Sequence, residues 1–237
     1  MVNSYRNKSV FITGNTGFKG SWLSLWLSKI GANVVGYSAS LVGNISHFEL
    51  LKLDMKTYFD DIKYLGNLKK AIKKTKPEIV FHLAAQPLVR YSYKNPIETF
   101  ETNIMGTANL LEACKGVDSI KAIVIVTTDK CYENKEWHHG YRENDRLGGY
   151  DPYSASKAGA EIITSSYRDS FFNLKDYQKT HQTLIATVRA GNVMGGGDWS
   201  EDRLIPDIIR ATIKNKTTII RNPNATRPWQ HVLELLY

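Results

Sequence analysis

Short runs of β-branched and apolar residues alternate with longer stretches of helical periodicity along most of this chain. We expect strands at residues 9–13, 33–37, 58–62, 79–83, 122–128 and 184–189, and helices at 18–30, 65–74, 97–115 and 152–172. Such alternation is typical of parallel βαβ units. The sequence therefore predicts an α/β fold of the Rossmann type, a doubly wound parallel sheet with helices on both faces.

The alternation weakens after residue 190, where three consecutive glycines and several prolines separate short elements. We therefore expect two units: a dinucleotide-binding domain over residues 1–190 and a partial, smaller substrate-binding lobe over residues 191–237. In the first helix, apolar residues at helical spacing predict a buried face. That face would consist of Phe18, Trp22, Leu25, Trp26 and Ile30.

Composition excludes several classes of protein. The chain has 237 residues, 42% of them hydrophobic, which is enough for a sizeable core, yet no apolar run approaches the ~20 residues that cross a bilayer. No signal-like run follows Met1, and Cys114 and Cys131 show no disulfide or metal-ligand spacing, so we expect a cytoplasmic protein that does not bind membranes.

The charge balance also limits the partners. The 31 Lys and Arg residues exceed the 23 Asp and Glu residues, giving a net charge of +8, but they are scattered and no nucleic-acid motif accompanies them. We expect no nucleic-acid partner, and interpret the excess as a solvated surface or as a preference for an anionic small substrate. His138 and His139 are adjacent and lack a third ligand nearby, so no metal site is expected.

A glycine-rich turn follows the first expected strand, at residues 13–20 (TGNTGFKG). Glycines allow a tight turn and close approach to a pyrophosphate, while the helix that follows presents free N–H groups to an anion. This strand–turn–helix context predicts dinucleotide binding. The candidate cofactor contacts in the turn are Gly14, Thr16, Gly17, Phe18 and Lys19.

The second expected strand ends in Tyr37-Ser38-Ala39-Ser40 and lacks the acidic residue that usually binds the adenosine ribose. No arginine for a 2′-phosphate is present there either, which favours NAD over NADP only slightly. Asp61 and Ile62, at the end of the third expected strand, could contact the adenine; Asp61 could equally be an ordinary loop carboxylate.

Tyr153 and Lys157 are four residues apart in an expected helix, so they share one helix face. A nearby cation stabilises a phenolate, and we therefore expect a lowered pKa for Tyr153 and a role as catalytic base. Asp129 and Lys130 follow the strand at 122–128, at the sheet edge where ligands bind. An acid–base pair there would suit an elimination reaction.

Five segments closely resemble the CDP-glucose 4,6-dehydratases, a branch of the extended short-chain dehydrogenase/reductase family. They are residues 14–23 (GNTGFKGSWL), 83–93 (LAAQPLVRYSY), 128–157, 189–199 (RAGNVMGGGDW) and 221–231 (RNPNATRPWQH). The Asp129–Lys130 pair is similar to this branch, since related dehydratases have Asp-Glu at that place.

The resemblance implies that NAD is reduced and then reoxidised within each turnover, while CDP-glucose is dehydrated to a 4-keto-6-deoxy sugar. Tyr153, assisted by Lys157 and Thr128, would take the proton of the sugar 4-hydroxyl. Asp129 would be the acid and Lys130 the base that remove water across C5 and C6. Lys130 could act so only in its neutral form.

Further contacts are implied by the resemblance alone. Ala84, Ala85 and Gln86 would line the cofactor, and Asn103 would help to order the active site. Asn192, Arg203 and Arg227 would meet the substrate diphosphate. Family members also form homodimers or larger homo-oligomers through the helices at 97–115 and 152–172, and they extend beyond the segment matching Tyr237, so we expect an incomplete substrate lobe and low activity.

Several alternatives stay open from the residues themselves. A 4-epimerase or a dehydratase for another nucleotide sugar would share the fold, although an epimerase would not need Asp129 and Lys130. A catalytically silent NAD-binding sensor would keep the glycine turn but would need neither Tyr153 nor Lys157.

Overall fold

A six-stranded parallel sheet forms the centre of the protein. The computed structural model describes residues 4–41 and 46–237. The strands lie in the order β3-β2-β1-β4-β5-β6, and every neighbouring pair is parallel. Their bounds are β1 Ser9–Thr13, β2 Asn33–Ser38, β3 Lys56–Phe59, β4 Ile79–His82, β5 Ala122–Val126 and β6 Leu184–Val188. This is the predicted Rossmann-type sheet, and its strand order reverses between β1 and β4, where such folds bind ligands.

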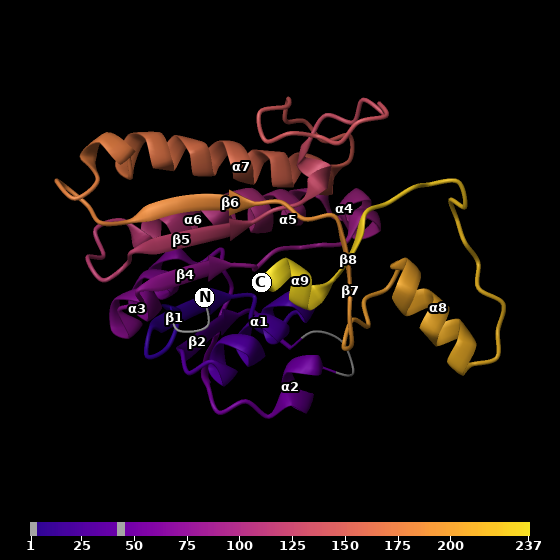
Figure 1. The fold of residues 1–237 in the computed structure, drawn as a ribbon, viewed down its shortest axis with the longest axis horizontal. Coiled ribbons are helices and arrows are strands. Elements are labelled where there is room, and N and C mark those ends of the chain that lie inside the picture. The colour runs from indigo at the N-terminus through magenta and orange to yellow at the C-terminus, as the bar shows by residue number, and fades with distance from the viewer. Residues whose placement is uncertain (1–3, 42–45) are drawn as a thin grey trace.

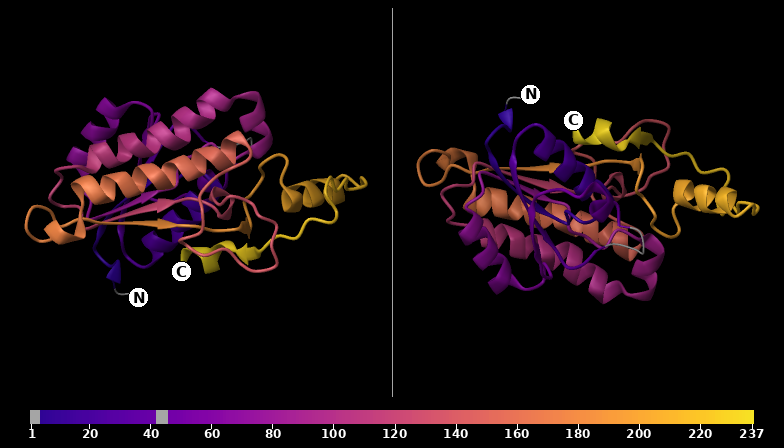
Figure 2. Two further views of the ribbon diagram at one scale, coloured as in Figure 1. Left: turned by 90° about the horizontal axis from the view of Figure 1, so that it is seen from above. Right: turned by 90° about the horizontal axis from the view of Figure 1, so that it is seen from below.

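Helices cover both faces of the sheet (Figures 1 and 2). One face carries α3 (Leu65–Thr75), α6 (Gly106–Cys114) and α7 (Pro152–Phe171); the other carries α1 (Phe18–Lys29) and α9 (Val232–Leu236). The alternation of side chains along β1 explains the two cores, since Phe11 belongs to the cluster on the α3 side while Val10 and Ile12 pack with Leu23 of α1.

The predicted buried face of α1 is wrong. The buried residues of α1 are Gly20, Ser21, Leu23, Ser24 and Leu27. Small residues bring the helix close to the sheet, and the bulkier tryptophans are displaced to its flanks. Trp22 stacks on His47 at a centroid distance of 5.2 Å, and Trp26 stacks on Tyr237 at 6.1 Å.

The remaining helices differ from the prediction mainly at their boundaries. The helix expected at 97–115 consists of α5 (Pro96–Phe100), a π-helical turn η2 (Glu101–Met105) and α6 in succession. The third strand lies two residues earlier than expected. Shorter helical elements complete this domain: α2 (His47–Leu51), α4 (Val89–Lys94), η3 (Asp129–Cys131) and η4 (Leu174–Asp176). No helix in the described ranges is both long and apolar enough to cross a membrane.

The last part of the chain forms a small second sheet and two helices. β7 (Asn192–Met194) pairs in parallel with β8 (Trp229–His231), and α8 (Leu204–Ile213) projects from one end of the molecule (Figure 1). The final helix, α9, returns to pack against α1, and its Val232 is fully buried. The end of the segment expected to form the second lobe therefore packs against α1, beside the six-stranded sheet.

Candidate active site

The glycine turn joins β1 to α1 and passes very close to the loop after β4. Gly14 has a φ of +73°, and a Cβ at this position would lie 2.6 Å from the backbone nitrogen of Ala84. A Cβ on Gly20 would overlap the carbonyl oxygen of Gly14. Any side chain at either position would strain the turn. The glycines therefore leave the backbone at the start of α1 uncovered by side chains.

A cavity of about 660 Å³ runs along the carboxyl edge of the strands from this turn. Its lining includes most of the predicted cofactor residues: Gly14, Thr16, Gly17, Phe18, Lys19, Asp61, Ile62, Ala84, Ala85 and Gln86, with Tyr153 and Lys157. A bare glycine turn at one end and a Tyr–Lys pair at the other fit an elongated dinucleotide with a central diphosphate.

The end of β2 is fixed to the turn by hydroxyl groups. The Thr16 hydroxyl donates to the carbonyl of Ser40 at 2.7 Å, and the Thr16 N–H donates to the Ser38 hydroxyl at 3.3 Å. Asp61 accepts the backbone N–H of Lys63 at 2.9 Å, and its other oxygen lies 3.5 Å from the Lys63 ammonium. Asp61 is thus placed by its own loop at the cavity wall.

Asn103 lies behind the cavity wall. Its amide is buried and bonded to the backbone of Gln86 in both directions and to the hydroxyl of Ser156. This geometry agrees with an ordering role, but its bonded amide offers no direct contact to a cofactor.

Tyr153 and Lys157 lie in the first two turns of α7. Asp151 caps the helix by accepting the N–H of Ser154 at 2.9 Å, and Tyr153 donates its backbone N–H to Ser92 at 3.1 Å. The Lys157 ammonium donates to the carbonyl of Val126 at 3.2 Å. Both side chains face the cavity as the spacing predicted.

The expected lowering of the tyrosine pKa is wrong in direction. Burial raises the pKa of Tyr153 to about 12, outweighing the opposing effects of the Thr128 hydroxyl and of Arg203. Lys157 instead has its own pKa lowered to about 8, mainly by burial and then by the charge of Lys19. The desolvation of both groups, which depends on the folded cavity, outweighs the pairing expected from their spacing.

Lys19 adds a further buried cation at the turn. Burial and the charge of Arg203 lower the pKa of Lys19 to about 8, while Asp129 and Asp198 oppose that shift. Arg203 donates to Asp198 at 3.0 Å and lines the same cavity as Tyr153. The centre of the cavity is therefore positively charged, as an anionic ligand requires.

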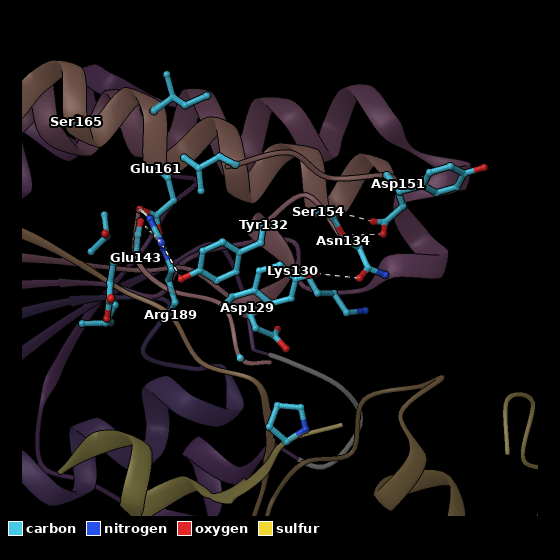
Figure 3. Close-up of a pocket in the computed structure, with 18 of the residues that line it drawn as sticks. Asp129, Lys130, Tyr132, Asn134, Glu143, Asp151, Ser154, Glu161, Ser165 and Arg189 are labelled. Carbon is cyan, nitrogen blue, oxygen red and sulfur yellow. Dashed lines mark hydrogen bonds and ion pairs between the residues drawn. The ribbon is translucent and has the colours of Figure 1, made fainter. Parts of the chain in front are cut away.

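Thr128, Asp129 and Lys130 follow β5 directly. The Thr128 hydroxyl donates to the Asp129 carboxylate at 2.9 Å, and the Asp129 N–H donates to the carbonyl of Ala190 at 2.9 Å. Asp129 and Lys130 line a second, larger cavity (Figure 3). Ser154 in the wall of this cavity is next in sequence to Tyr153 in the wall of the first. Since Asp129 also raises the pKa of Tyr153, this carboxylate in one cavity lies close to the phenol in the other.

The three predicted diphosphate residues are placed differently. Arg227 is exposed and lines the larger cavity, whereas Arg203 lines the cofactor cavity. Asn192 begins β7 and donates its backbone N–H to Pro228 at 3.0 Å, and it lines neither cavity. No group of three or more potential metal ligands occurs within residues 4–41 and 46–237.

The sequence model of the GDP-mannose 4,6-dehydratase family matches residues 11–236. The chain belongs to this family. A CDP-glucose 4,6-dehydratase of Salmonella typhimurium is 56% identical over 99% of this chain and 66% of that protein. A dTDP-D-glucose 4,6-dehydratase of Dictyostelium discoideum is 33% identical over 90% of this chain and 50% of that protein. The chain thus spans about half to two thirds of the length of these relatives.

Solved structures share the fold. The epimerase Mth375 of Methanothermobacter thermautotrophicus superposes with a TM-score of 0.84 at 25% identity, covering 99% of this chain and 67% of that one. MoeE5 in complex with UDP-glucose and NAD superposes with a TM-score of 0.79 at 26% identity, covering 96% of this chain and 69% of that one.

A buried ion pair beside the site was not predicted from the sequence. Glu161 and Arg189 line the larger cavity and are bound to each other (Figure 3). One signal was available: Glu161 lies four residues after Lys157, on the same face of α7 and next to Ala160. A charged residue on a helix face that must be buried requires a partner.

Proposed function

We propose that this chain carries the cofactor-binding domain and the reacting side chains of an NAD-dependent dehydratase that converts CDP-glucose to CDP-4-dehydro-6-deoxyglucose. The observation that carries the proposal is the position of Asp129 and Lys130, which line a cavity adjoining the one that holds Tyr153 and Lys157. Proton-transfer groups for an elimination thus adjoin a dinucleotide cavity. The similarity to the Salmonella CDP-glucose 4,6-dehydratase supports this substrate.

NAD, when bound, would supply the oxidation and re-reduction of the sugar, taking a hydride from C4 and returning it to C6. The glycine turn at Gly14 would hold its diphosphate, and Asp61 and Ile62 would contact the adenine. MoeE5, which is similar to this chain, has been solved with NAD and a nucleotide sugar, and this supports the choice of cofactor and of substrate class.

The side chains of this chain would move the protons. Tyr153 would accept the proton of the 4-hydroxyl, and the Thr128 hydroxyl, which opposes the rise in the pKa of Tyr153, would assist it. Because the pKa of Tyr153 is raised by burial, the phenol has to be activated by charge. Lys157, Lys19 and Arg203 are the cations placed along the same cavity, and each would favour the phenolate.

Loss of water would be the task of the Asp129–Lys130 pair. A ketone at C4 acidifies the C5 proton, which Lys130 would take while Asp129 protonates the departing 6-hydroxyl. Lys130 would return a proton to C5 as the hydride adds to C6, and the proton taken by Tyr153 would replace the one given up by Asp129. The balance is CDP-glucose in, and the 4-keto-6-deoxy product plus one water out. We assign the diphosphate contacts to Arg203 and Arg227, and an ordering role to Asn192, whose backbone starts β7.

Domain organisation and assembly belong to the same proposal. Residues 1–190 would be the NAD-binding domain and residues 191–237 a part of the substrate lobe. Exposed apolar side chains on the helices of one face support a homo-oligomer: Ile97, Met105, Ile162 and Phe171. The two free cysteines agree with a reducing compartment such as the cytoplasm. Sedimentation of the purified protein tests this, since a monomer at micromolar concentration would contradict it.

The decisive experiment is mass spectrometry of CDP-glucose incubated with the purified protein and NAD in heavy water. The expected product is lighter by one water and carries one solvent deuterium at C5. Asp129→Asn and Lys130→Met should abolish it. Unchanged CDP-glucose in the presence of bound NAD would reject this substrate, and conversion of another nucleotide hexose would replace it.

A further inference from the structure

A buried ion pair joins three elements next to the larger cavity. The Nε and Nη2 atoms of Arg189 donate to the two carboxylate oxygens of Glu161, each at 2.9 Å. The side chains are 4% exposed for Glu161 and 16% for Arg189. The Thr127 hydroxyl also donates to Glu161. Glu161 in α7 thus binds the end of β5 and the residue that follows β6, a strong two-point contact.

The electrostatics show that this pair is charged. Burial alone would raise the pKa of Glu161, but hydrogen bonds from Arg189, Thr127 and Thr187 bring it below its ordinary value. The pKa of Arg189 is raised further above its usual range, first of all by Glu161. Both groups therefore stay ionised, and each compensates the burial of the other.

Arg189 has little capacity left for a ligand. Its Nη1 donates to the Tyr132 hydroxyl at 2.9 Å and to the carbonyl of Glu143 at 3.0 Å. With the two bonds to Glu161, four of the five guanidinium N–H groups are engaged within the protein. Figure 3 shows Arg189 between Glu161 and Tyr132. Its geometry is that of a fixed support, not of a diphosphate ligand.

The residues bound to this ion pair lie on either side of Asp129 and Lys130 in the sequence. Thr127, bound to Glu161, directly precedes Thr128, and Tyr132, bound to Arg189, directly follows η3. Between them, the N–H of Asp129 donates to the carbonyl of Ala190, the residue after Arg189. One ion pair therefore fixes η3 in space through contacts at both of its ends.

We propose that Glu161, Arg189 and Tyr132 form an anchor that positions Asp129 and Lys130 for the loss of water. This inference rests on the proposed function and adds positioning residues to it. Tyr153 and Lys157 are placed separately, by the first turns of α7 and by the contacts of these turns with Ser92 and Val126. Loosening the anchor at Tyr132 should therefore impair the removal of the C5 proton more than the oxidation at C4.

Two mild variants test the anchor without leaving a buried charge unpaired. Tyr132→Phe removes only the hydroxyl that accepts from Arg189, and Arg189→Lys keeps the charge but loses the two-point contact. We expect kcat to fall about 10- to 100-fold with little change in KM, since small displacements of reacting groups cost rates of this size. The kinetic isotope effect with substrate deuterated at C5 should rise, while that with substrate deuterated at C4 should not.

Tyr167→Phe provides the matched control. It likewise removes a single tyrosine hydroxyl, in this case one that donates to Glu112 at 3.5 Å, and Tyr167 lines neither cavity. This variant should keep the wild-type kcat and both isotope effects. Hydrogen–deuterium exchange gives a readout independent of activity: amides 129–132 should exchange faster in Tyr132→Phe than in Tyr167→Phe, with β1 and β4 unchanged.

Three outcomes would overturn the anchor. Unchanged exchange at residues 129–132 would remove its structural basis. A fall in kcat with both isotope effects unaltered would indicate only a loss of active protein. A rise confined to the C4 isotope effect would place the support under Tyr153 instead. If the wild-type protein dehydrates no nucleotide hexose, the proposed function fails, yet the exchange experiment still decides whether the anchor holds this segment.

Discussion

The side-chain amide of Asn103 donates a hydrogen bond of 2.8 Å to the hydroxyl of Ser156, which in turn donates to the carbonyl of Tyr153 at 2.7 Å. The same amide accepts the N–H of Gln86 at 2.8 Å and donates to its carbonyl at 3.1 Å. One buried side chain in the π-helical turn therefore connects the loop after β4 with the first turn of α7.

Asn103→Ala should disturb both of these regions at once. It leaves the partly buried peptide groups of Gln86 without their side-chain partner, which costs about 1–3 kcal/mol in the free energy of unfolding. We also expect kcat/KM to fall about tenfold, because Tyr153 loses part of its support. Urea denaturation and steady-state kinetics measure the two effects. Asn67→Ala, which removes an exposed amide in α3, should lower neither; wild-type kinetics in Asn103→Ala would contradict the positioning role.

Local rules were sufficient for the strands and for the glycine turn. The turn at Gly14 could be predicted because a positive φ and a close backbone approach demand glycine wherever they occur. The buried face of α1 could not be predicted from the sequence. Close packing against the sheet requires small residues such as Gly20 and Ser24, whereas apolar periodicity assigns the tryptophans to the core. Burial depends on the partner surface, which one helix does not encode.

Tyr153 and Lys157 show the same division. Their spacing predicted a shared helix face, since helical geometry is local, and both line one cavity; it did not predict the direction of the shift in the tyrosine pKa. Desolvation arises from all the elements that close over the phenol. The contact between Glu161 and Arg189 joins residues 28 positions apart in sequence. The helical spacing of Glu161 indicates that it is buried and needs a partner, but no local pattern identifies Arg189 as that partner.

His82 is buried at the end of β4 between two threonine hydroxyls. Thr107 uses its proton to donate to the carbonyl of Asn103 at 2.7 Å, so it accepts from Nε2 of His82 at 3.1 Å. Nδ1 then accepts from the Thr13 hydroxyl at 2.7 Å. This chain of bonds assigns the neutral Nε2–H tautomer, which nitrogen chemical shifts of the labelled histidine should show unchanged between pH 5 and pH 8.

His82 should also contribute to acid sensitivity. Burial, followed by the charge of Lys157, lowers the pKa of His82 from 6.5 to about 3. Between these values the unfolded chain binds a proton that the folded protein does not, so stability falls as the pH falls through this window. At pH 4.5 the loss is about 2 to 3 kcal/mol. His82→Gln should show a correspondingly flatter decline in urea unfolding from pH 6.5 to 4.5; an equally steep decline would assign the effect to other groups.

The two cysteines should be inert in the native protein. Burial raises the pKa of Cys131 to about 12 and that of Cys114 still further above its ordinary value. Only the thiolate reacts with alkylating agents. At pH 8 we expect neither cysteine to be labelled by iodoacetamide in the native protein and both to be labelled in guanidinium chloride, as counted by mass spectrometry. Rapid labelling of Cys131 before unfolding would reveal opening of η3.

Lys157 should lower the stability of the fold at neutral pH. Burial first, and the charge of Lys19 second, lower its pKa from 10.5 to about 8. Below pH 8 the group is protonated in both the folded and the unfolded state, so the folded protein bears the cost of burying the charge. Lys157→Met, which keeps a long side chain, should therefore raise the free energy of unfolding at pH 7 by on the order of 1–3 kcal/mol while activity is lost.

The pH dependence separates this effect from improved packing. Between pH 8 and 10.5 the unfolded wild-type chain holds a proton on Lys157 that the folded protein has released, so wild-type stability rises with pH. The advantage of Lys157→Met should accordingly shrink across this range. Urea unfolding of both proteins at pH 7, 8.5 and 10 measures it. A constant advantage would indicate packing, and a variant less stable than wild type at pH 7 would show that the bond to Val126 outweighs the cost of the buried charge.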